Sequence, residues 1–123
     1  MATRIERLKN LDLIPLAQRL GELCTTGSVE VSAAESCTGG GIASAITAVP
    51  GSSAYFTTGY VTYSNAAKTR LLGVPEEMLG RHGAVSEAVV KAMVAGACRD
   101  SGADIAVAVS GVAGPEGGSD AKP

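Results

Sequence analysis

The sequence predicts an α/β domain: a three-layer α/β/α arrangement with helices on a mixed, partly parallel β-sheet. The first observation is the order of patterns along the chain, which alternates between helix and strand as layered α/β folds do. The second is the composition, because 46% of the 123 residues are hydrophobic, with 16 Gly, one Phe and no Trp. A core so poor in aromatic rings closes by near approach of small residues, as helices packed on a sheet do. The length fits one domain with its own core.

The first elements are two helices separated by a strand. Leucines recur at broadly helical spacing over residues 8–23, where Pro15 either breaks the run or begins the main helix. Residues 26–28 (Thr-Gly-Ser) end this helix. The small and β-branched residues 29–34 predict a buried strand. An amphipathic helix then begins at Thr38 and stops at Pro50-Gly51.

The middle of the chain predicts a strand followed by a short helix. Residues 55–63 are rich in aromatic and β-branched side chains, which favours a strand with a bulge at Gly59. Ser64 or Asn65 can cap the short helix that follows, and Gly73 closes it.

The last elements are helical turns, a long helix and a strand. Pro75, followed by two glutamates, favours the start of a helical turn. Ser86 caps a long helix with one apolar face, which ends at residues 101–102 (Ser-Gly). Residues 104–110 are small and apolar, which is typical of a strand covered on both faces.

Charge and cysteine content exclude several classes of function. With 10 basic and 12 acidic residues the net charge is −2, which offers no field for nucleic acid and no polybasic membrane anchor. Neither a signal peptide nor a membrane span is indicated. The cysteines are odd in number and far apart, so we expect reduced thiols in a cytoplasmic protein. Because His82 is alone and no ligand pair has metal spacing, we predict no metal and no cofactor.

The first candidate for chemistry is the segment at residues 35–41 (Glu-Ser-Cys-Thr-Gly-Gly-Gly), between a strand and a helix. Ser36 at the strand tip could attack an acyl carbon, while the N–H groups of the new helix hold the oxyanion. Alternatively, Ser36 or Thr38 only caps the helix, and the glycines only allow close packing.

The second candidate is the segment at residues 63–68 (Tyr-Ser-Asn-Ala-Ala-Lys), after the next strand. Lys68 could activate a serine if burial or a neighbouring charge lowers its pKa. Alternatively, Lys68 is an ordinary solvated lysine and Tyr63 a half-buried strand aromatic.

The third candidate is the glycine-rich segment at residues 110–118, which again follows a strand. Its N–H groups suit a nest around an anion such as a phosphate, although the spacing is not that of a P-loop. A flexible surface loop is the alternative.

Five short motifs follow one another along the chain, and their order resembles that of a known family. They are residues 35–40 (Glu-Ser-Cys-Thr-Gly-Gly), 50–53 (Pro-Gly-Ser-Ser), 63–68 (Tyr-Ser-Asn-Ala-Ala-Lys), 82–86 (His-Gly-Ala-Val-Ser) and 111–115 (Gly-Val-Ala-Gly-Pro). This series closely resembles the CinA C-terminal domain family, the nicotinamide-nucleotide amidohydrolases. The likeness runs from about residue 13 to the end of the chain.

The resemblance implies hydrolysis of the carboxamide of nicotinamide mononucleotide to nicotinate mononucleotide and ammonia. It makes Ser36 the nucleophile, whose proton Lys68 takes with the help of Tyr63. The lysine or the tyrosine would then protonate the departing ammonia. Backbone N–H groups near Thr38 to Gly40 would hold the oxyanion, and the glycine loop would hold the ribose-phosphate. The residues expected to bind substrate are Thr38, Gly39, Gly40, Ser110, Gly111, Ala113, Gly114 and Gly117.

The resemblance also bears on the extent of the domain and on its partners. Residues 1–123 are expected to form a single domain of this family, lacking the strands and helix that follow the Lys-Pro in other members. A frayed tail is the alternative interpretation of the glycine-rich end. Ser110 stands where the family often carries Thr. The family implies a homodimer and a small nucleotide substrate; the alternative function is a catalytically silent pyridine-nucleotide-binding or assembly module.

Overall fold

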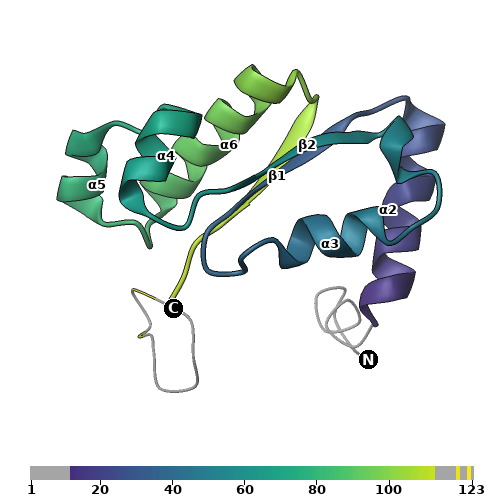
Figure 1. Cartoon of the computed structure of the whole chain (residues 1–123), viewed down its shortest axis with the longest axis horizontal. Helices are drawn as coiled ribbons and strands as arrows, with labels where there is room; N and C mark the ends of the chain where they lie inside the picture. The colour runs from purple at the N-terminus through teal and green to yellow at the C-terminus, as the bar shows by residue number, and fades with distance from the viewer. Residues whose placement is uncertain (1–11, 113–118, 120–121, 123) are drawn as a thin grey trace, which may run out of the picture.

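The computed structural model describes residues 12–112, 119 and 122 (Figure 1). Its elements, in chain order, are α2 (Leu13–Gly27), β1 (Val31–Glu35), α3 (Gly41–Thr47), the 3₁₀ turn η1 (Ser52–Ala54), β2 (Phe56–Val61), α4 (Asn65–Leu72), α5 (Glu76–His82), α6 (Glu87–Ser101) and β3 (Ile105–Val109). The predicted α/β class is confirmed, and so is the order of elements within the described residues. None of the described helices is both long enough and apolar enough to cross a membrane.

The sheet has the strand order β2-β1-β3, and both described pairs are parallel. The mixed character expected for the sheet is therefore not seen among these strands. All five residues of β1 are buried, as expected for the central strand. The predicted bulge is present, but it lies at residues 57–58 rather than at Gly59, because β2 carries an extra residue between Phe56 and Gly59, the partners of Val31 and Ala33.

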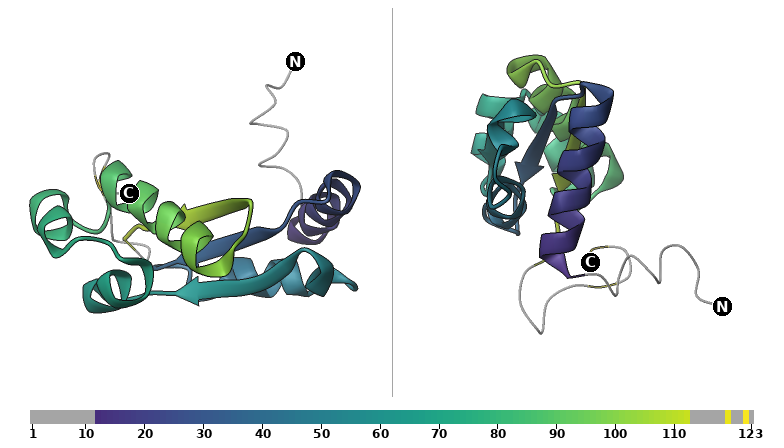
Figure 2. Two further views of the ribbon diagram at one scale, coloured as in Figure 1. Left: turned by 90° about the horizontal axis from the view of Figure 1, so that it is seen from above. Right: turned by 90° about the vertical axis from the view of Figure 1, so that its right-hand side faces the viewer.

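The connections between the strands leave the sheet on opposite faces (Figure 2). Helix α3 joins β1 to β2 on one face, whereas α4, α5 and α6 join β2 to β3 on the other. The first connection runs from β1 to β2, and the second runs in the opposite direction, from β2 past β1 to β3. Because parallel crossovers are right-handed, two connections that run in opposite directions use opposite faces of the sheet. The segments that follow β1 and β2 therefore diverge, and this is where open α/β sheets form their ligand crevice.

Several helix ends follow the local signals in the sequence. Ser64 accepts a hydrogen bond from the backbone N–H of Ala67 at 3.1 Å, and so caps α4. Ser86 caps α6 in the same way through the N–H of Val89. Pro15 lies in the first turn of α2, where its missing N–H costs no helical hydrogen bond. These ends agree with the predictions.

The prediction that the last strand is covered on both faces is wrong for the described structure. Ile105 and Val107 of β3 are 58% and 46% exposed, whereas Ala106 and Ala108 pack against the core. β3 is an edge of the described sheet, and α6 covers only one of its faces. Because alternate residues of a strand point to opposite faces, an uncovered face exposes every second residue.

Helices α4 and α6 approach each other at a glycine, which yields a testable prediction. A Cβ on Gly96 would overlap the carbonyl oxygen of Leu72. We expect Gly96→Ala to lower the free energy of unfolding by about 1–3 kcal/mol, because backbone must move to admit the methyl group. Gly80→Ala on α5 is the matched control, since nothing lies within 4 Å of its added Cβ.

Urea denaturation of the two variants measures the difference. Gly80→Ala is expected to raise the free energy of unfolding by about 0.5–1 kcal/mol, because alanine loses less conformational entropy in a helix. Equal stability of the two variants would contradict the close α4–α6 packing.

Candidate active site

Ser36 and Lys68 are in direct contact at the carboxyl ends of β1 and β2. Ser36 directly follows β1, and Lys68 lies on α4, the helix after β2. The Lys68 Nζ lies 2.9 Å from the Ser36 Oγ. Ser36 is 7% exposed and Lys68 only 1% exposed. The interpretation of Lys68 as an ordinary solvated lysine is therefore wrong.

The Lys68 amine is surrounded by oxygen atoms that carry no formal charge. Besides Ser36, it donates to the carbonyl oxygens of Thr62 at 2.8 Å and Tyr63 at 3.3 Å. In the described part of the chain, no acidic side chain forms an ion pair with it. Burial lowers the pKa of Lys68 below its ordinary value, and the charge of a Cys37 thiolate would oppose this by a smaller amount. Burial without a counter-charge favours the neutral amine.

A neutral Lys68 fits this geometry as a general base. The neutral amine has two N–H groups and one lone pair, and the carbonyls of Thr62 and Tyr63 accept the two N–H groups. The lone pair is then left for the hydroxyl of Ser36, which donates to Nζ in this protonation state. This pairing of nucleophile and base within hydrogen-bond reach is what nucleophilic catalysis requires.

Neither Ser36 nor Thr38 caps the following helix. Helix α3 begins at Gly41, later than the predicted start at Thr38, and its N-cap residue Gly40 has no side chain to offer. Gly39 and Gly40 both have positive φ, at 59° and 104°, in the turn that leads into the helix. The interpretation of Ser36 or Thr38 as a mere helix cap is therefore wrong.

Sequence reasoning missed Glu35, which performs the capping from the end of β1. Its Oε1 accepts hydrogen bonds from the Thr38 hydroxyl at 2.7 Å and the Ile42 N–H at 2.9 Å, and its Oε2 accepts from the Ala43 N–H at 3.0 Å. Burial alone would raise the pKa of Glu35, but the hydrogen bonds from Thr38, Ala43 and Ile42 outweigh it and lower the pKa. The sequence did contain a signal for this role: Glu35 is an acidic residue at the end of a buried strand, and the helix that follows has glycine at its N-cap.

The segment between Ser36 and α3 leaves two backbone N–H groups free. The Gly39 N–H donates to the carbonyl of Ser36 at 3.1 Å, and the Gly41 N–H to that of Thr38 at 3.0 Å. The Gly40 N–H is directed to the Glu35 carboxylate and helps to lower its pKa. Within the described residues, the N–H groups of Cys37 and Thr38 have no acceptor. These two N–H groups are therefore the donors of this segment that remain available to an oxyanion next to Ser36.

Tyr63 contributes its backbone to the site, while its side chain lies outside. Its carbonyl oxygen accepts from Lys68 and lies 3.5 Å from the Ser36 Oγ. The side chain is 66% exposed, and its hydroxyl has no hydrogen bond to a described residue. The structure thus does not bring the tyrosine hydroxyl to Ser36 or Lys68.

Two of the predicted substrate-binding residues lie next to Ser36 along the carboxyl edge of the sheet. Ser110 and Gly111 directly follow β3, whose last residue Val109 accepts a hydrogen bond from the N–H of Ser36 at 3.0 Å. The three others of this loop (Ala113, Gly114 and Gly117) lie outside the described residues.

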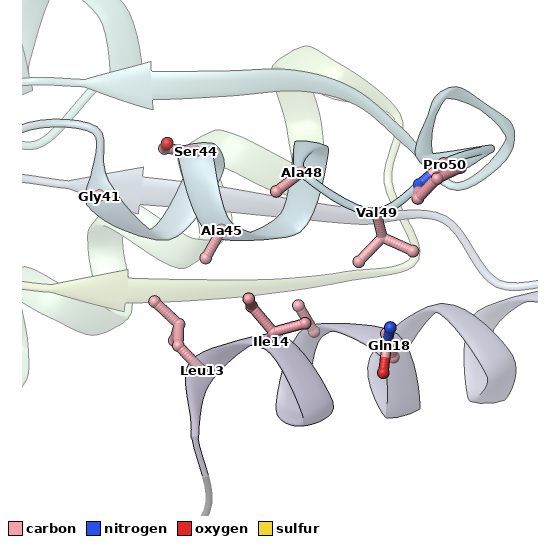
Figure 3. Close-up of a pocket in the computed structure, with 10 residues that line it drawn as sticks. Leu13, Ile14, Gln18, Gly41, Ser44, Ala45, Ala48, Val49 and Pro50 are labelled. Carbon is pink, nitrogen blue, oxygen red and sulfur yellow. The ribbon is translucent and has the colours of Figure 1, made fainter.

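A cavity of about 350 Å³ lies on the opposite side of the sheet, between α2 and α3 (Figure 3). Leu13 and Ile14 face Ala45 and Val49 across it. Its lining is apolar apart from Gln18 and Ser44, so it offers no general acid, base or charged group. No three His, Cys, Asp or Glu residues gather as a metal site in the part of the chain that the structure covers.

Comparisons with known proteins agree on one family. A family model described as the CinA C-terminal domain matches residues 13–123. A nicotinamide-nucleotide amidohydrolase from Pseudomonas putida is 68% identical over 108 residues, which cover 88% of this chain and 68% of that protein. A CinA-like protein from Chloroherpeton thalassium is 52% identical over 110 residues, which cover 89% of this chain but 26% of that longer protein.

Solved structures agree with the sequence matches. The crystal structure of competence damage-inducible protein A from Klebsiella pneumoniae superposes with a TM-score of 0.86 at 43% identity, covering 92% of this chain and 70% of that one. The CihA protein from Agrobacterium tumefaciens superposes with a TM-score of 0.85 at 50% identity, covering 92% and 68%. The chain therefore shares most of its length with each relative, while each relative extends beyond the shared part.

Proposed function

The chain belongs to the CinA C-terminal domain family, and on that basis we propose that it hydrolyses the carboxamide of nicotinamide mononucleotide to nicotinate mononucleotide and ammonia. The name of the relative from Pseudomonas putida supports the substrate class. The observation that carries the chemistry is the 2.9 Å contact between the Ser36 Oγ and the buried Lys68 Nζ.

In the proposed acylation step, neutral Lys68 takes the hydroxyl proton of Ser36 while the Oγ attacks the carboxamide carbon. The carbonyl oxygen becomes an oxyanion, which the N–H groups of Cys37 and Thr38 stabilise. As the tetrahedral intermediate collapses, the C–N bond breaks, and the proton held on Lys68 passes to the departing nitrogen. Ammonia leaves, and the nicotinoyl group stays on Ser36 as an ester.

Deacylation reverses the roles of the groups. A water molecule attacks the ester carbon while Lys68 accepts its proton. The bond to Oγ then breaks, and the proton held on Lys68 returns to the Oγ of Ser36. Nicotinate mononucleotide leaves with the second proton of the water on its carboxyl group and becomes a carboxylate when it gives that proton to the solvent. No net proton is left on the enzyme side chains, so the site is ready for another turnover.

The remaining predicted residues form the rest of the proposal. Gly39 and Gly40 give the backbone room beside the substrate. Ser110 and Gly111, with the loop residues beyond them, contact the ribose-phosphate. The proposal also includes the hydroxyl of Tyr63, which contacts neither Ser36 nor Lys68 in the structure, as a group that assists protonation of the leaving ammonia. We further propose that the protein acts as a homodimer.

The Tyr63→Phe variant separates the hydroxyl of Tyr63 from its carbonyl. The carbonyl that orients Lys68 is retained, so folding and the Ser36–Lys68 contact are expected to persist. We expect kcat for ammonia release to fall by about 10²-fold, the lower end of the range for a general acid. If the Tyr63→Phe variant has the wild-type kcat, the hydroxyl of Tyr63 takes no part in the reaction.

The proposed function is tested by ammonia release from nicotinamide mononucleotide. The assay compares the 123-residue chain with the same chain extended by the C-terminal segment of the Pseudomonas putida relative, so that an effect of chain length is separated from chemistry. Folded, extended protein that releases no ammonia would contradict the proposal. Thermal stabilisation by the nucleotide without ammonia release would favour a silent binding module instead.

A further inference from the structure

We propose that Glu35 is a positioning residue, whose buried carboxylate fixes the segment at residues 36–40 so that its free N–H groups meet the oxyanion. This inference rests on the proposed function and adds a residue to it. Glu35 reaches no reacting atom, because its carboxylate is directed to the start of α3 rather than to Lys68. Its effect is therefore transmitted through the segment that carries the oxyanion donors.

Because successive side chains of a strand point to opposite faces of the sheet, Glu35 and Ser36 lie on different faces. Ala34 packs in the core beneath α6, and Ser36 points to the same face, where it contacts Lys68. Glu35 points to the other face, which α3 covers. Adjacent residues thus hold the segment from both sides: Ser36 through Lys68, and Glu35 through the start of α3.

The carboxylate of Glu35 caps the start of α3, which Gly40 cannot do because it has no side chain. The first N–H groups of a helix need acceptors from outside the helix, and a side chain at the N-cap normally provides one. Gly40 provides none, and its φ of 104° is a conformation that favours glycine. Glu35 accepts from both Ile42 and Ala43 instead. The turn can therefore adopt its glycine conformation without losing the cap.

The same contacts decide which N–H groups remain for catalysis. Since Glu35 occupies the N–H groups of Ile42 and Ala43, the helix terminus itself is not available to an oxyanion. The donors are left at Cys37 and Thr38, before the helix begins. The hydroxyl of Thr38 also donates to Glu35, which ties one of these two residues directly to the carboxylate.

A group that positions oxyanion donors has a characteristic kinetic effect. The donors bind the transition state more tightly than the ground state, so their misplacement lowers kcat and leaves KM almost unchanged. We expect Glu35→Gln to lower kcat for ammonia release by about 10- to 100-fold, as a misplacement of up to an ångström does. The change in KM should stay within about twofold.

Asp104→Asn is the matched control. Asp104 also accepts a hydrogen bond from a backbone N–H, that of Glu30 at 2.9 Å, but at the opposite end of β1. The substitution makes the same carboxylate-to-amide change away from Ser36, so kcat should stay at the wild-type value. The end point of labelling by a fluorophosphonate probe gives the fraction of active Ser36 in each sample, and kcat is divided by it.

The outcomes separate the inference from the proposed function. A folded Glu35→Gln protein with wild-type kcat per active site, or a loss matched by Asp104→Asn, would overturn the role of Glu35. If Glu35→Gln does not fold, Thr38→Val removes one contact to the carboxylate, and unchanged kcat in that variant overturns the inference. If the wild-type protein releases no ammonia, the proposed function fails, and the initial rate of fluorophosphonate labelling then tests Glu35 by the same comparison.

Discussion

Replacing Ser36 with Ala is expected to lower ammonia release from nicotinamide mononucleotide by about 10⁴-fold or more, because no other side chain replaces the nucleophile. The fold should persist, since the substitution removes a single oxygen atom. A neutral Lys68 keeps both of its carbonyl acceptors at Thr62 and Tyr63. The measurement is steady-state ammonia release on protein whose folding has been checked by circular dichroism.

Ser32→Ala is the matched control for the nucleophile. Ser32 is a buried serine of β1, the strand that Ser36 directly follows, and it points to the same face of the sheet. Its hydroxyl donates to the carbonyl of Thr58 at 2.6 Å rather than contacting Lys68. Its loss should cost about 1 kcal/mol of stability and leave kcat unchanged. Equal activity of the Ser36→Ala protein and the wild type would exclude Ser36 as the nucleophile.

The Lys68→Met variant is expected to lose activity by about 10³-fold or more while remaining folded. Methionine has a similar length and volume, so the buried position stays filled. The variant avoids burying an amine but leaves the carbonyls of Thr62 and Tyr63 without their donor. These effects oppose each other, so the free energy of unfolding should change by no more than about 2 kcal/mol.

The pH dependence distinguishes a general base from a structural lysine. The pKa of Lys68 is lower in the folded protein than in the unfolded chain, so kcat/KM should rise with pH as the folded-state amine loses its proton. Between the two pKa values the unfolded chain binds more protons, and stability therefore rises with pH up to about 10.5. The Lys68→Met protein should lack this rise.

Lys91→Met is the control for removal of a lysine. Lys91 is exposed and pairs with Glu87 on the surface of α6. The substitution should change stability by less than about 0.5 kcal/mol and leave the pH profile intact. If Lys68→Met retained the wild-type rate and pH profile, Lys68 could not be the base.

The features predicted correctly from the sequence are those with a local cause. Ser64 and Ser86 cap helices because a serine before an amphipathic segment meets free N–H groups within its own turn. Gly73 ends α4 because the left-handed conformation at a helix end favours glycine. Such signals need no knowledge of what packs against the helix. The order of strands and helices follows from the same kind of information.

The features that escaped prediction depend on residues far apart in the sequence. Lys68 is buried where it contacts Ser36, which lies 32 residues earlier in the chain. Glu35 caps α3 across the intervening glycine turn, so the helix begins later than the pattern from Thr38 suggested. The exposure of Ile105 depends on which helices reach β3, which no local pattern records. Periodicity alone could not supply these facts.

The most direct measurement of the proposed chemistry is the mass of the protein quenched in acid during the first turnover with nicotinamide mononucleotide. A nicotinoyl ester on Ser36 is stable in acid once Lys68 can no longer activate water. The wild-type protein should gain the mass of the acyl group of nicotinate mononucleotide, located on the peptide that contains Ser36, and the Ser36→Ala protein should gain none. Release of ammonia with no acylated protein at any quench time, or an adduct on another residue, would contradict nucleophilic catalysis by Ser36.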